Sequence, residues 1–332
     1  MYTLLGISLT LAFLLIVNMA VAIFASALWR VVSKHVLGLS VGTQAQLIFG
    51  LRILPVAAAL VFVFGFVVPS YLLHEPLESG EIVSNKLGLI AAASSIGVLI
   101  ALYRVLSTWW VTRSLTANWL RSAEPLQLAD VSVPTFKISH QFPVIAVVGI
   151  FRPKLFVAEQ ALASLDQNEF SAAIAHEFGH LRANDNFKRT VLRVCRDLLI
   201  VPFGKELDHA WAENAESLAD EFAATRGGST ALDLASALVK IARIVPANTC
   251  PAMPAAAFMI GETQTDITTR VRRLVRLSET KLIAEQHRFL GFSPFGLFSA
   301  AALAALIVLP LIDQQCLTST HEVVEQFVSL LR

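Results

Sequence analysis

The most regular feature of the sequence is a set of four long runs without a charged residue. They extend over residues 1–29, 53–73, 87–103 and 289–312. A membrane-crossing helix needs about 20 apolar residues, with a range of about 17–25. The third run meets only the lower limit of that range, and a buried helix of a soluble domain is its alternative. We predict four spans, three of them within residues 1–110.

The charges between these runs are distributed unevenly, and this distribution predicts an orientation. Residues 30–52 carry three Lys or Arg and no acid, whereas residues 74–86 carry three Glu and one Lys. Lys and Arg accumulate in cytoplasmic loops. We therefore expect an outside N-terminus, a cytoplasmic domain over 111–288, a fourth span over 289–312 and a short extracytoplasmic tail over 313–332. The expected location is the cell (inner) membrane, with several passes.

The composition agrees with a membrane protein and excludes some other classes. Hydrophobic residues make up 55% and charged residues 15%, against roughly a quarter charged in soluble proteins. The net charge of +1 gives no field that would attract nucleic acid, so we expect the lipid bilayer as a partner and no direct nucleic-acid binding.

The three cysteines form no CxxC pair, which argues against a disulfide framework or a cysteine zinc site. The first basic residue is Arg30, so the first run lacks the charged start of a cleavable signal peptide and is expected to remain as a span.

The block between the third and fourth runs has mixed periodicity. Apolar stretches at 143–148 and 154–157 flank Gly149 and predict two strands joined by a turn. Residues 164–167 fit a capping box at the start of a helix that continues through residues 176–180. The fold class expected is therefore α+β, namely a four-span α-helical membrane protein with a mainly helical cytoplasmic domain.

Three further helices are predicted in this block. One is capped by Asp185 or Asn186, and the others cover residues 206–226 and 269–288. The apolar stripe expected on the first comprises Phe187, Val191, Val194 and Leu198. The stripe expected to pack the second on the domain core comprises Leu207, Trp211, Leu218 and Phe222.

The sequence His176-Glu177-Phe178-Gly179-His180 carries the clearest chemistry. Two histidines at i and i+4 share one face of a helix, which lets both imidazoles reach one zinc ion. Glu177, one position from His176, can then contact a metal-bound water without ligating the metal. The alternative is an amphipathic helix with two surface histidines.

Two histidines leave a catalytic zinc site one protein ligand short. Downstream, Glu213, Glu216 and Asp220 lie at i, i+3 and i+7 of the helix predicted over 206–226, so they share a face. A carboxylate there can complete a His₂Glu site, with Asp220 orienting an imidazole N–H. The spacing alone does not choose between Glu213 and Glu216, and a solvated acidic face is the alternative.

HEFGHLRANDN at 176–186, followed by ESLADEFAA at 216–224, resembles the membrane gluzincin peptidases of the BlaR/MecR type. The likeness covers roughly residues 1–312 and is most specific over 142–225. It implies zinc, one ion per chain, with His176, His180 and Glu216 as ligands, Asp220 beside them and Glu177 as the catalytic base. Ala219 stands where that family often has Cys. With 20 residues after Ile312, we expect no extracellular penicillin-binding sensor.

A second resemblance is to membrane gluzincins of the HtpX/CAAX-protease type, which share HExxH and a later ExxxD. The order of three spans, zinc domain and fourth span favours the BlaR/MecR type. Either likeness implies a membrane-bound zinc endopeptidase that cleaves a protein or peptide substrate, for example a regulator, at the cytoplasmic side. In that reaction zinc acidifies a water to a pKa of about 7 and Glu177 takes its proton.

Several alternatives and secondary sites remain open from the sequence. A non-proteolytic signalling scaffold would show a damaged motif, and a transporter would carry ionisable residues within its spans. The strand near Val144–Val148 is a candidate to pair with an extended substrate. Four arginines after residue 269 fit either anionic lipid headgroups or a plain positive-inside signal, namely Arg270, Arg272, Arg273 and Arg276.

Overall fold

Three long apolar helices dominate the computed structural model, which describes residues 2–36, 38–76, 83–128, 131–198, 204–244, 264–279 and 314–331. They are α1 (Tyr2–Val36), α2 (Val41–Phe62) with its continuation, and α4 (Asn85–Arg121). α2 continues without a break through the π-helical turn η1 (Val63–Val67) into α3 (Val68–His74). By length and hydropathy these are three candidate membrane spans, including the marginal third run. The fourth predicted span lies outside the described residues.

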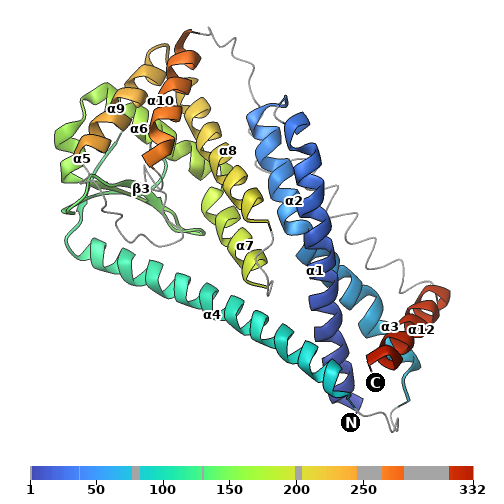
Figure 1. Ribbon diagram of the computed structural model, residues 1–332. Helices are drawn as coiled ribbons and strands as arrows, with labels where there is room; N and C mark the ends of the chain where they lie inside the picture. The colour runs from blue at the N-terminus through green and yellow to red at the C-terminus, as the bar shows by residue number, and fades with distance from the viewer. Residues whose placement is uncertain are drawn as a thin grey trace.

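The helices extend well beyond the uncharged runs. α1 and α2 are separated only by residues 37–40, and Ser40 caps α2 by accepting a hydrogen bond from the backbone N–H of Thr43. Most of the segment expected as a loop over 30–52 is therefore helical. α4 likewise continues past Tyr103 to Arg121, where Trp119 packs on Phe156 of the sheet. α4 thus joins the membrane bundle to the domain directly (Figure 1).

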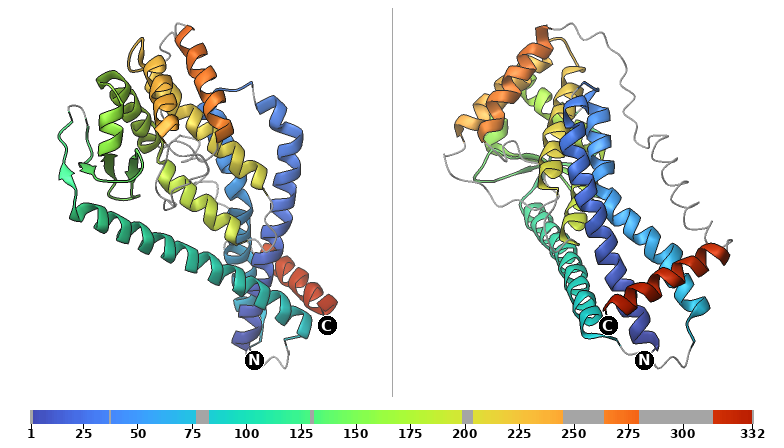
Figure 2. Two further views of the ribbon diagram at one scale, coloured as in Figure 1. Left: turned by 60° about the vertical axis from the view of Figure 1, so that its left-hand side comes forward. Right: turned by 45° about the vertical axis from the view of Figure 1, so that its right-hand side comes forward.

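The C-terminal helix α12 (Gln314–Leu331) packs across the end of the bundle at which the chain begins (Figure 2). The Ser70 hydroxyl donates a 2.8 Å hydrogen bond to the carbonyl oxygen of Leu317. Val324 and Val328 are buried in an apolar cluster with residues of α1 and η1, such as Leu9 and Val67. The two termini therefore lie at the same end of the molecule, away from α9 and α10.

The domain contains a four-stranded sheet of order β1-β2-β4-β3. β1 (Glu124–Pro125) pairs antiparallel with β2 (Thr135–Ile138), and β2 pairs parallel with β4 (Lys154–Ala158). β3 (Ile145–Val148) forms an antiparallel hairpin with β4. Its turn contains Gly149 at φ +109°, a conformation that favours glycine. The predicted strand–turn–strand is confirmed, and β3 lies at an edge of the sheet.

Helices surround this sheet and supply the rest of the domain. They are α5 (Glu159–Ser164), α6 (Gln167–Ala183), α7 (Asp185–Asp197), α8 (Lys205–Ala224), α9 (Thr230–Ile244) and α10 (Gln264–Glu279). The helix predicted through residues 176–180 is confirmed as α6. Its capping box is formed by Asp166 and Glu169, so the helix begins after Asp166 and not at Ser164.

Two predictions about the α7 helix are wrong. Its N-cap is Asn184, which has φ 56° and makes no side-chain cap hydrogen bond, whereas Asp185 and Asn186 point to other partners. Leu192 and Cys195, not the expected stripe, are its buried apolar residues, and Phe187 is 49% exposed. The stripe was misplaced because α7 packs against α2 and α4 as well as against its own domain.

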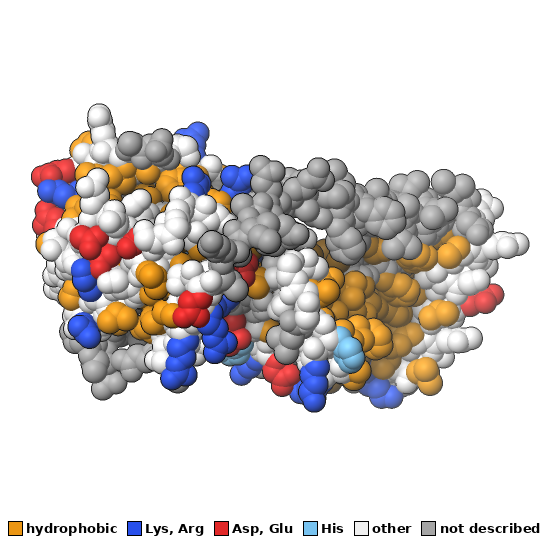
Figure 3. Space-filling model, turned by 90° about the horizontal axis from the view of Figure 1, so that it is seen from above, with side chains coloured by type: hydrophobic (Ala, Val, Ile, Leu, Met, Phe, Trp, Pro, Cys, Tyr) orange, Lys and Arg blue, Asp and Glu red, His pale blue; other side chains and the backbone are white. Residues whose placement is uncertain are grey.

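The apolar stripe of α8 also faces an unexpected partner. Leu207 and Trp211 are buried against Ile48 of α2 and its neighbours, not in the domain core. Seen from above, hydrophobic side chains gather over the half of the molecule that holds α1–α3, and charged side chains over the half that holds the domain (Figure 3). The domain therefore packs directly on the candidate spans through α7 and α8.

Candidate metal centre

α6 and α8 bring three potential metal ligands together. The Nε2 atoms of His176 and His180, one helical turn apart on α6, lie 3.1 Å from each other. The Glu216 carboxylate of α8 places Oε2 3.6 Å from His176 Nε2 and Oε1 3.7 Å from His180 Nε2. The three side chains form a group whose ligand atoms lie within 4.8 Å of one another. Both imidazoles are buried, which excludes the alternative of two surface histidines.

The close approach of the two helices depends on Gly179. A Cβ at this position would lie 2.8 Å from the Cα and 3.1 Å from the Cβ of Ala219 on α8. A non-bonded contact of a Cβ at 2.8 Å essentially never occurs, so only glycine fits here without a shift of one helix. Because Ala219 lies three residues after Glu216, this contact sets the distance from the Glu216 carboxylate to the histidines.

A carboxylate lies next to the Nδ1 atom of each histidine ring. Asp220 Oδ1 lies 3.0 Å from His176 Nδ1, and Asp185 Oδ2 lies 2.9 Å from His180 Nδ1. Carboxylates in this position fix the ring orientation and direct the Nε2 lone pairs toward a metal. The Asp220 contact was predicted from the sequence, whereas Asp185 was interpreted only as a helix cap.

A buried arginine from α10 completes the cluster. Arg270 donates from Nη1 to Glu216 Oε2 at 2.9 Å and from Nη2 to Asp220 Oδ1 at 2.7 Å, and Nη2 lies 3.4 Å from His176 Nε2. The interpretation of Arg270 as a headgroup ligand is therefore wrong. Sequence reasoning missed this role because Arg270 is 50 residues from Asp220 along the chain.

Glu177 lies beside the ligand group but outside it. Its Oε2 accepts a 3.2 Å hydrogen bond from the backbone N–H of Val147 on β3. Burial raises the pKa of the Glu177 carboxyl, although the two nearby imidazoles lower it in part. A carboxylate with a raised pKa beside potential metal ligands is suited to accept and return a proton.

The ionisation of the ligand group is set by burial and by neighbouring charges. Burial alone would lower the pKa of His176, but the carboxylates of Asp220 and Glu216 outweigh it and raise that pKa to about 9. Burial alone would raise the pKa of Glu216, but the Arg270 guanidinium and then the two imidazoles hold it far below its usual value. A metal must therefore displace the proton of His176, while Glu216 is already ionised.

The donor set fits zinc. Four carboxylates, those of Glu177, Asp185, Glu216 and Asp220, surround the two imidazoles, and Arg270 contacts two of them, Glu216 and Asp220. Buried negative charge of this size needs compensation, and a divalent cation supplies it. Two nitrogens and one carboxylate are the ligand set of His₂Glu zinc enzymes, which leave a fourth position open.

Of the two carboxylates left open by the spacing, only one reaches the histidines. Glu213 is exposed on α8 and is not part of the ligand group. Glu216 is, and its assignment as the third ligand remains a proposal. The acidic face of α8 is therefore divided between the site and the solvent.

The edge of β3 next to the site is partly occupied. The Asn186 side-chain amide donates to the carbonyl oxygens of Val147 and Gly149 at 3.0 and 3.2 Å. Together with the bond from Val147 to Glu177, this uses both backbone groups of Val147 that face away from β4. A substrate strand must replace these contacts or pair with Ile145.

Comparison with known proteins agrees with this geometry. Residues 146–217 match the family model of peptidase family M48. The matched segment includes β3 from its second residue on, the whole of α6 and Glu216, and ends before Asp220. A search of curated proteins finds no match to the chain. Residues 146–217 are therefore similar to peptidase family M48, a family of zinc metallopeptidases, and the chain also has three candidate membrane spans.

Proposed function

We propose that the protein is a membrane-bound zinc endopeptidase that cleaves protein substrates at the cytoplasmic side, in signalling or regulated proteolysis. The observation that carries the proposal is the convergence of two imidazole nitrogens and the Glu216 carboxylate beside Glu177. The BlaR/MecR type is preferred for its order of elements. The match to family M48 does not separate it from a quality-control protease of the HtpX/CAAX type.

In the proposed reaction, different residues of the site bind the metal, transfer the proton and orient the ligands. A zinc ion held by His176, His180 and Glu216 would polarise the scissile carbonyl and acidify the attacking water. Glu177 accepts the proton of that water on its carboxylate and passes it to the leaving amine. Asp220 and Asp185 keep the two imidazoles in the orientation and tautomer that binding requires.

Substrate recognition follows from the position of β3. An extended peptide can add to this edge strand through backbone hydrogen bonds, which would place its carbonyl groups near Glu177. Asn186 would then release Val147 and Gly149 as the substrate binds. This arrangement favours an unfolded or extended segment of a protein over a small folded ligand.

A second class of function, a signalling scaffold with a vestigial site, is less well supported. The proposal of catalysis is supported by the carboxylates of Asp220 and Asp185, which lie 3.0 and 2.9 Å from Nδ1 of the two histidines. A scaffold would gain nothing from a buried Glu177 directed at β3. We therefore propose catalysis as the function of this centre.

The test is the substitution Glu177→Gln, which keeps the shape of the side chain and removes its proton acceptor. We expect the variant to retain zinc and to lose peptidase activity by about 10²–10⁴-fold, the usual contribution of a general base. The measurement is metal content by mass spectrometry, together with proteome-wide mapping of new protein N-termini in cells that express each form.

The matched control is Glu213→Gln, the same chemical change on an exposed carboxylate of the same domain. It should retain both zinc and wild-type cleavage. Substrate cleavage at the wild-type rate in the Glu177→Gln variant would rule out the mechanism.

A further inference from the structure

A second group of potential metal ligands lies at the end of the molecule that holds both termini, away from the metal centre (Figures 1 and 2). It consists of Glu75, directly after α3, and of His321 and Glu325 on α12. One ring nitrogen of His321 and one oxygen of each carboxylate lie within 4.8 Å of one another. All three side chains are half-buried. We call them the α3–α12 group.

The three side chains come from two different elements. His321 and Glu325 stand at i and i+4 on α12, so they share one face of that helix. Glu75 follows the last residue of α3, and its backbone N–H donates a 3.0 Å hydrogen bond to the carbonyl oxygen of Tyr71. The ligand atoms therefore meet only because α12 packs on the end of α3.

This packing holds the imidazole of His321 in place. The ring stacks on that of His74, with centroids 5.3 Å apart and planes at 22°. His74 Nδ1 in turn donates to the carbonyl oxygen of Ser70 at 3.1 Å, and its Nε2 lies 3.3 Å from the Thr318 hydroxyl on α12. The buried Ser70 hydroxyl donates to the carbonyl oxygen of Leu317. A ligand that is already ordered loses little conformational freedom when it binds.

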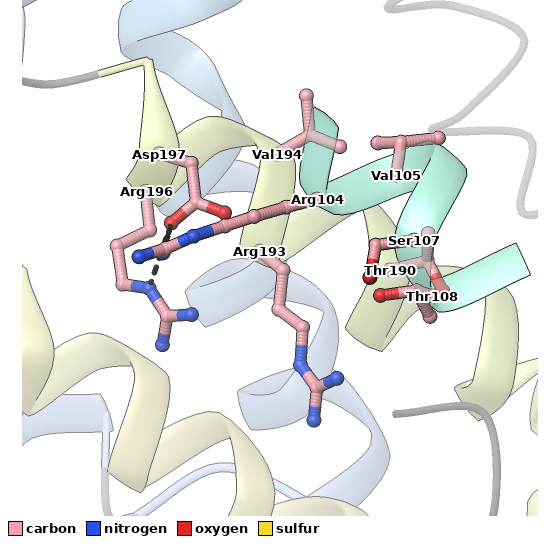
Figure 4. A pocket seen from close by; sticks show the side chains of 9 residues that line it. All are labelled: Arg104, Val105, Ser107, Thr108, Thr190, Arg193, Val194, Arg196 and Asp197. Carbon is pink, nitrogen blue, oxygen red and sulfur yellow. Dashed lines mark hydrogen bonds and ion pairs between the residues drawn. The ribbon is translucent and has the colours of Figure 1, made fainter. Parts of the chain in front are cut away.

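The charge of this end of the molecule favours a cation. Residues 74–86 carry three Glu and one Lys, and residues 313–332 carry three acidic residues and one Arg. Carboxylates in excess raise the local concentration of cations. The contact of α4 with α7 is different, because there Arg104 and Arg196 converge on Asp197 (Figure 4).

We propose that Glu75, His321 and Glu325 form a second metal site, which binds zinc and joins α12 to α3. One imidazole nitrogen and two carboxylate oxygens are donors that zinc accepts. The imidazole selects against magnesium and calcium, which take oxygen ligands. A ligating carboxylate is itself commonly hydrogen-bonded, so zinc binding is compatible with further contacts of either glutamate. The proposal does not depend on peptidase activity. With the topology proposed from the loop charges, this site faces the outside.

The experiment uses the full chain in detergent, stripped of metal with a chelator and then titrated with zinc alone. Zinc per chain is measured by native mass spectrometry, and affinity by competition with a chelator. We expect the wild type to bind one zinc ion more than His321→Ala. Glu325→Gln should lower the affinity of this site by more than about tenfold, because losing a ligand costs more than a change beside one. The matched control, Glu322→Gln, alters an exposed carboxylate of the same helix and should bind zinc like the wild type.

A second measurement tests whether the metal joins the two elements. Zinc should slow amide hydrogen exchange in α12 of the wild type and of Glu322→Gln, but not of Glu325→Gln, which keeps both stacked histidines. Equal zinc uptake by the wild type and by the folded His321→Ala and Glu325→Gln variants would overturn the site. Exchange in α12 that zinc leaves unchanged in the wild type would overturn its joining role. Each comparison is between forms with the same metal centre, so a failure of the proposed peptidase site does not affect it.

The two zinc sites can also be told apart directly. Glu216→Ala removes a proposed ligand of the metal centre and should leave the zinc ion bound by the α3–α12 group. Loss of all zinc from Glu216→Ala, with full zinc in His321→Ala, would place the metal at the metal centre alone and overturn the second site.

Discussion

At the scale of single residues, the two motif histidines depend on carboxylates that come from different parts of the chain. Asp185 follows the motif after a left-handed turn at Asn184, and Asp220 reaches His176 from α8. Arg270 then ties Asp220 to Glu216. Glu216 is consequently held by Arg270 with its carboxylate facing the two rings, as a third metal ligand requires.

This arrangement predicts that Glu216 is the third ligand and Glu213 is not. Glu216→Ala should reduce bound zinc severely, because the remaining two histidines supply neither the charge nor the coordination number that zinc requires. Glu213→Ala should leave about one zinc per chain, because its carboxylate is exposed and outside the group. Zinc content of the two purified proteins decides the matter. Full zinc in the first and loss in the second would reverse the assignment.

Some residues of the metal centre can be predicted from the sequence and others cannot, for a physical reason. His176, Glu177 and His180 are readable because a helix fixes the geometry of residues four apart. Asp220 is readable by the same rule from Glu216. Arg270 is not, because its contact depends on how α10 packs, and Asp185 was hidden by its second possible role as a cap. Its spacing, five residues after His180, is a signal in the sequence that could have been used.

At the scale of elements, the site depends on the packing of α6 on α8. Gly179 and Ala219 are the contact, and both are small enough for the helix backbones to meet. A larger residue at position 179 separates the helices, since a Cβ on Gly179 lies 2.8 Å from the Cα of Ala219. The glycine inside the motif is thus needed for the third ligand, although it carries no chemistry of its own.

Gly179→Ala should therefore weaken zinc binding while leaving every ligand in the sequence. Overpacking of this kind costs about 1–3 kcal/mol, and the shift of Glu216 should lower zinc affinity roughly 10–100-fold, as changes just outside a ligand shell do. Zinc affinity by competition with a chelator measures the effect. The control is Gly50→Ala in α2, where a Cβ meets nothing within 4 Å. An unchanged affinity in Gly179→Ala would show that the helices can separate without moving Glu216.

Helices and strands could be predicted from the sequence where neighbouring turn or capping residues mark their ends. The β3–β4 hairpin and α6 follow from adjacent turn and capping residues. β2 pairs in parallel with β4, the second strand of the hairpin, and not with β3, which follows it in the sequence. No local turn therefore signals this pairing. The buried face of α7 was assigned wrongly because a helix between two partners has no single apolar stripe.

At the scale of the whole molecule, the ends of the apolar runs contact one corner of the domain, formed by the end of α7 and the start of α8. Arg30, Arg52 and Arg104 border the first, second and third runs. They pair with Glu206, Asp208 and Asp197, which lie at the start of α8 and the end of α7. The Asn18 side chain also donates to the carbonyl oxygen of Leu198, at 3.5 Å. We infer that this corner of the domain lies at the cytoplasmic boundary of the spans.

That inference, with the unequal loop charges, predicts the topology. A reporter inserted within residues 246–254 should be active in the cytoplasm, and one fused at Leu331 should be active outside. The position of α12 beside the N-terminus supports the second expectation (Figure 2). Paired alkaline phosphatase and fluorescent protein fusions measure both sides. Activity of both reporters on the same side would show that the chain does not cross the membrane between them.

The three ion pairs at this corner should contribute very unequally to how the domain is held on the spans. Arg52 is 2% exposed and donates from Nε to Asp208 Oδ1 at 2.7 Å, whereas the Arg30 and Glu206 side chains are 71% and 62% exposed and 3.5 Å apart. Removing one partner of a buried pair leaves an uncompensated charge and costs about 3–5 kcal/mol, while an exposed pair contributes roughly 0–1 kcal/mol.

Asp208→Ala should therefore destabilise the protein by about 3 kcal/mol, the lower end of that range because Asp208 itself is 23% exposed. Glu206→Ala, a matched removal of a carboxylate two residues away, should change stability by less than about 1 kcal/mol. Denaturant unfolding in detergent, followed by zinc release, measures both variants. Zinc should leave the Asp208→Ala protein at lower denaturant, because α8 carries Glu216 as well as Asp208. Equal stability of the two variants would mean that α8 is held on α2 by its apolar contacts alone, through Leu207 and Trp211.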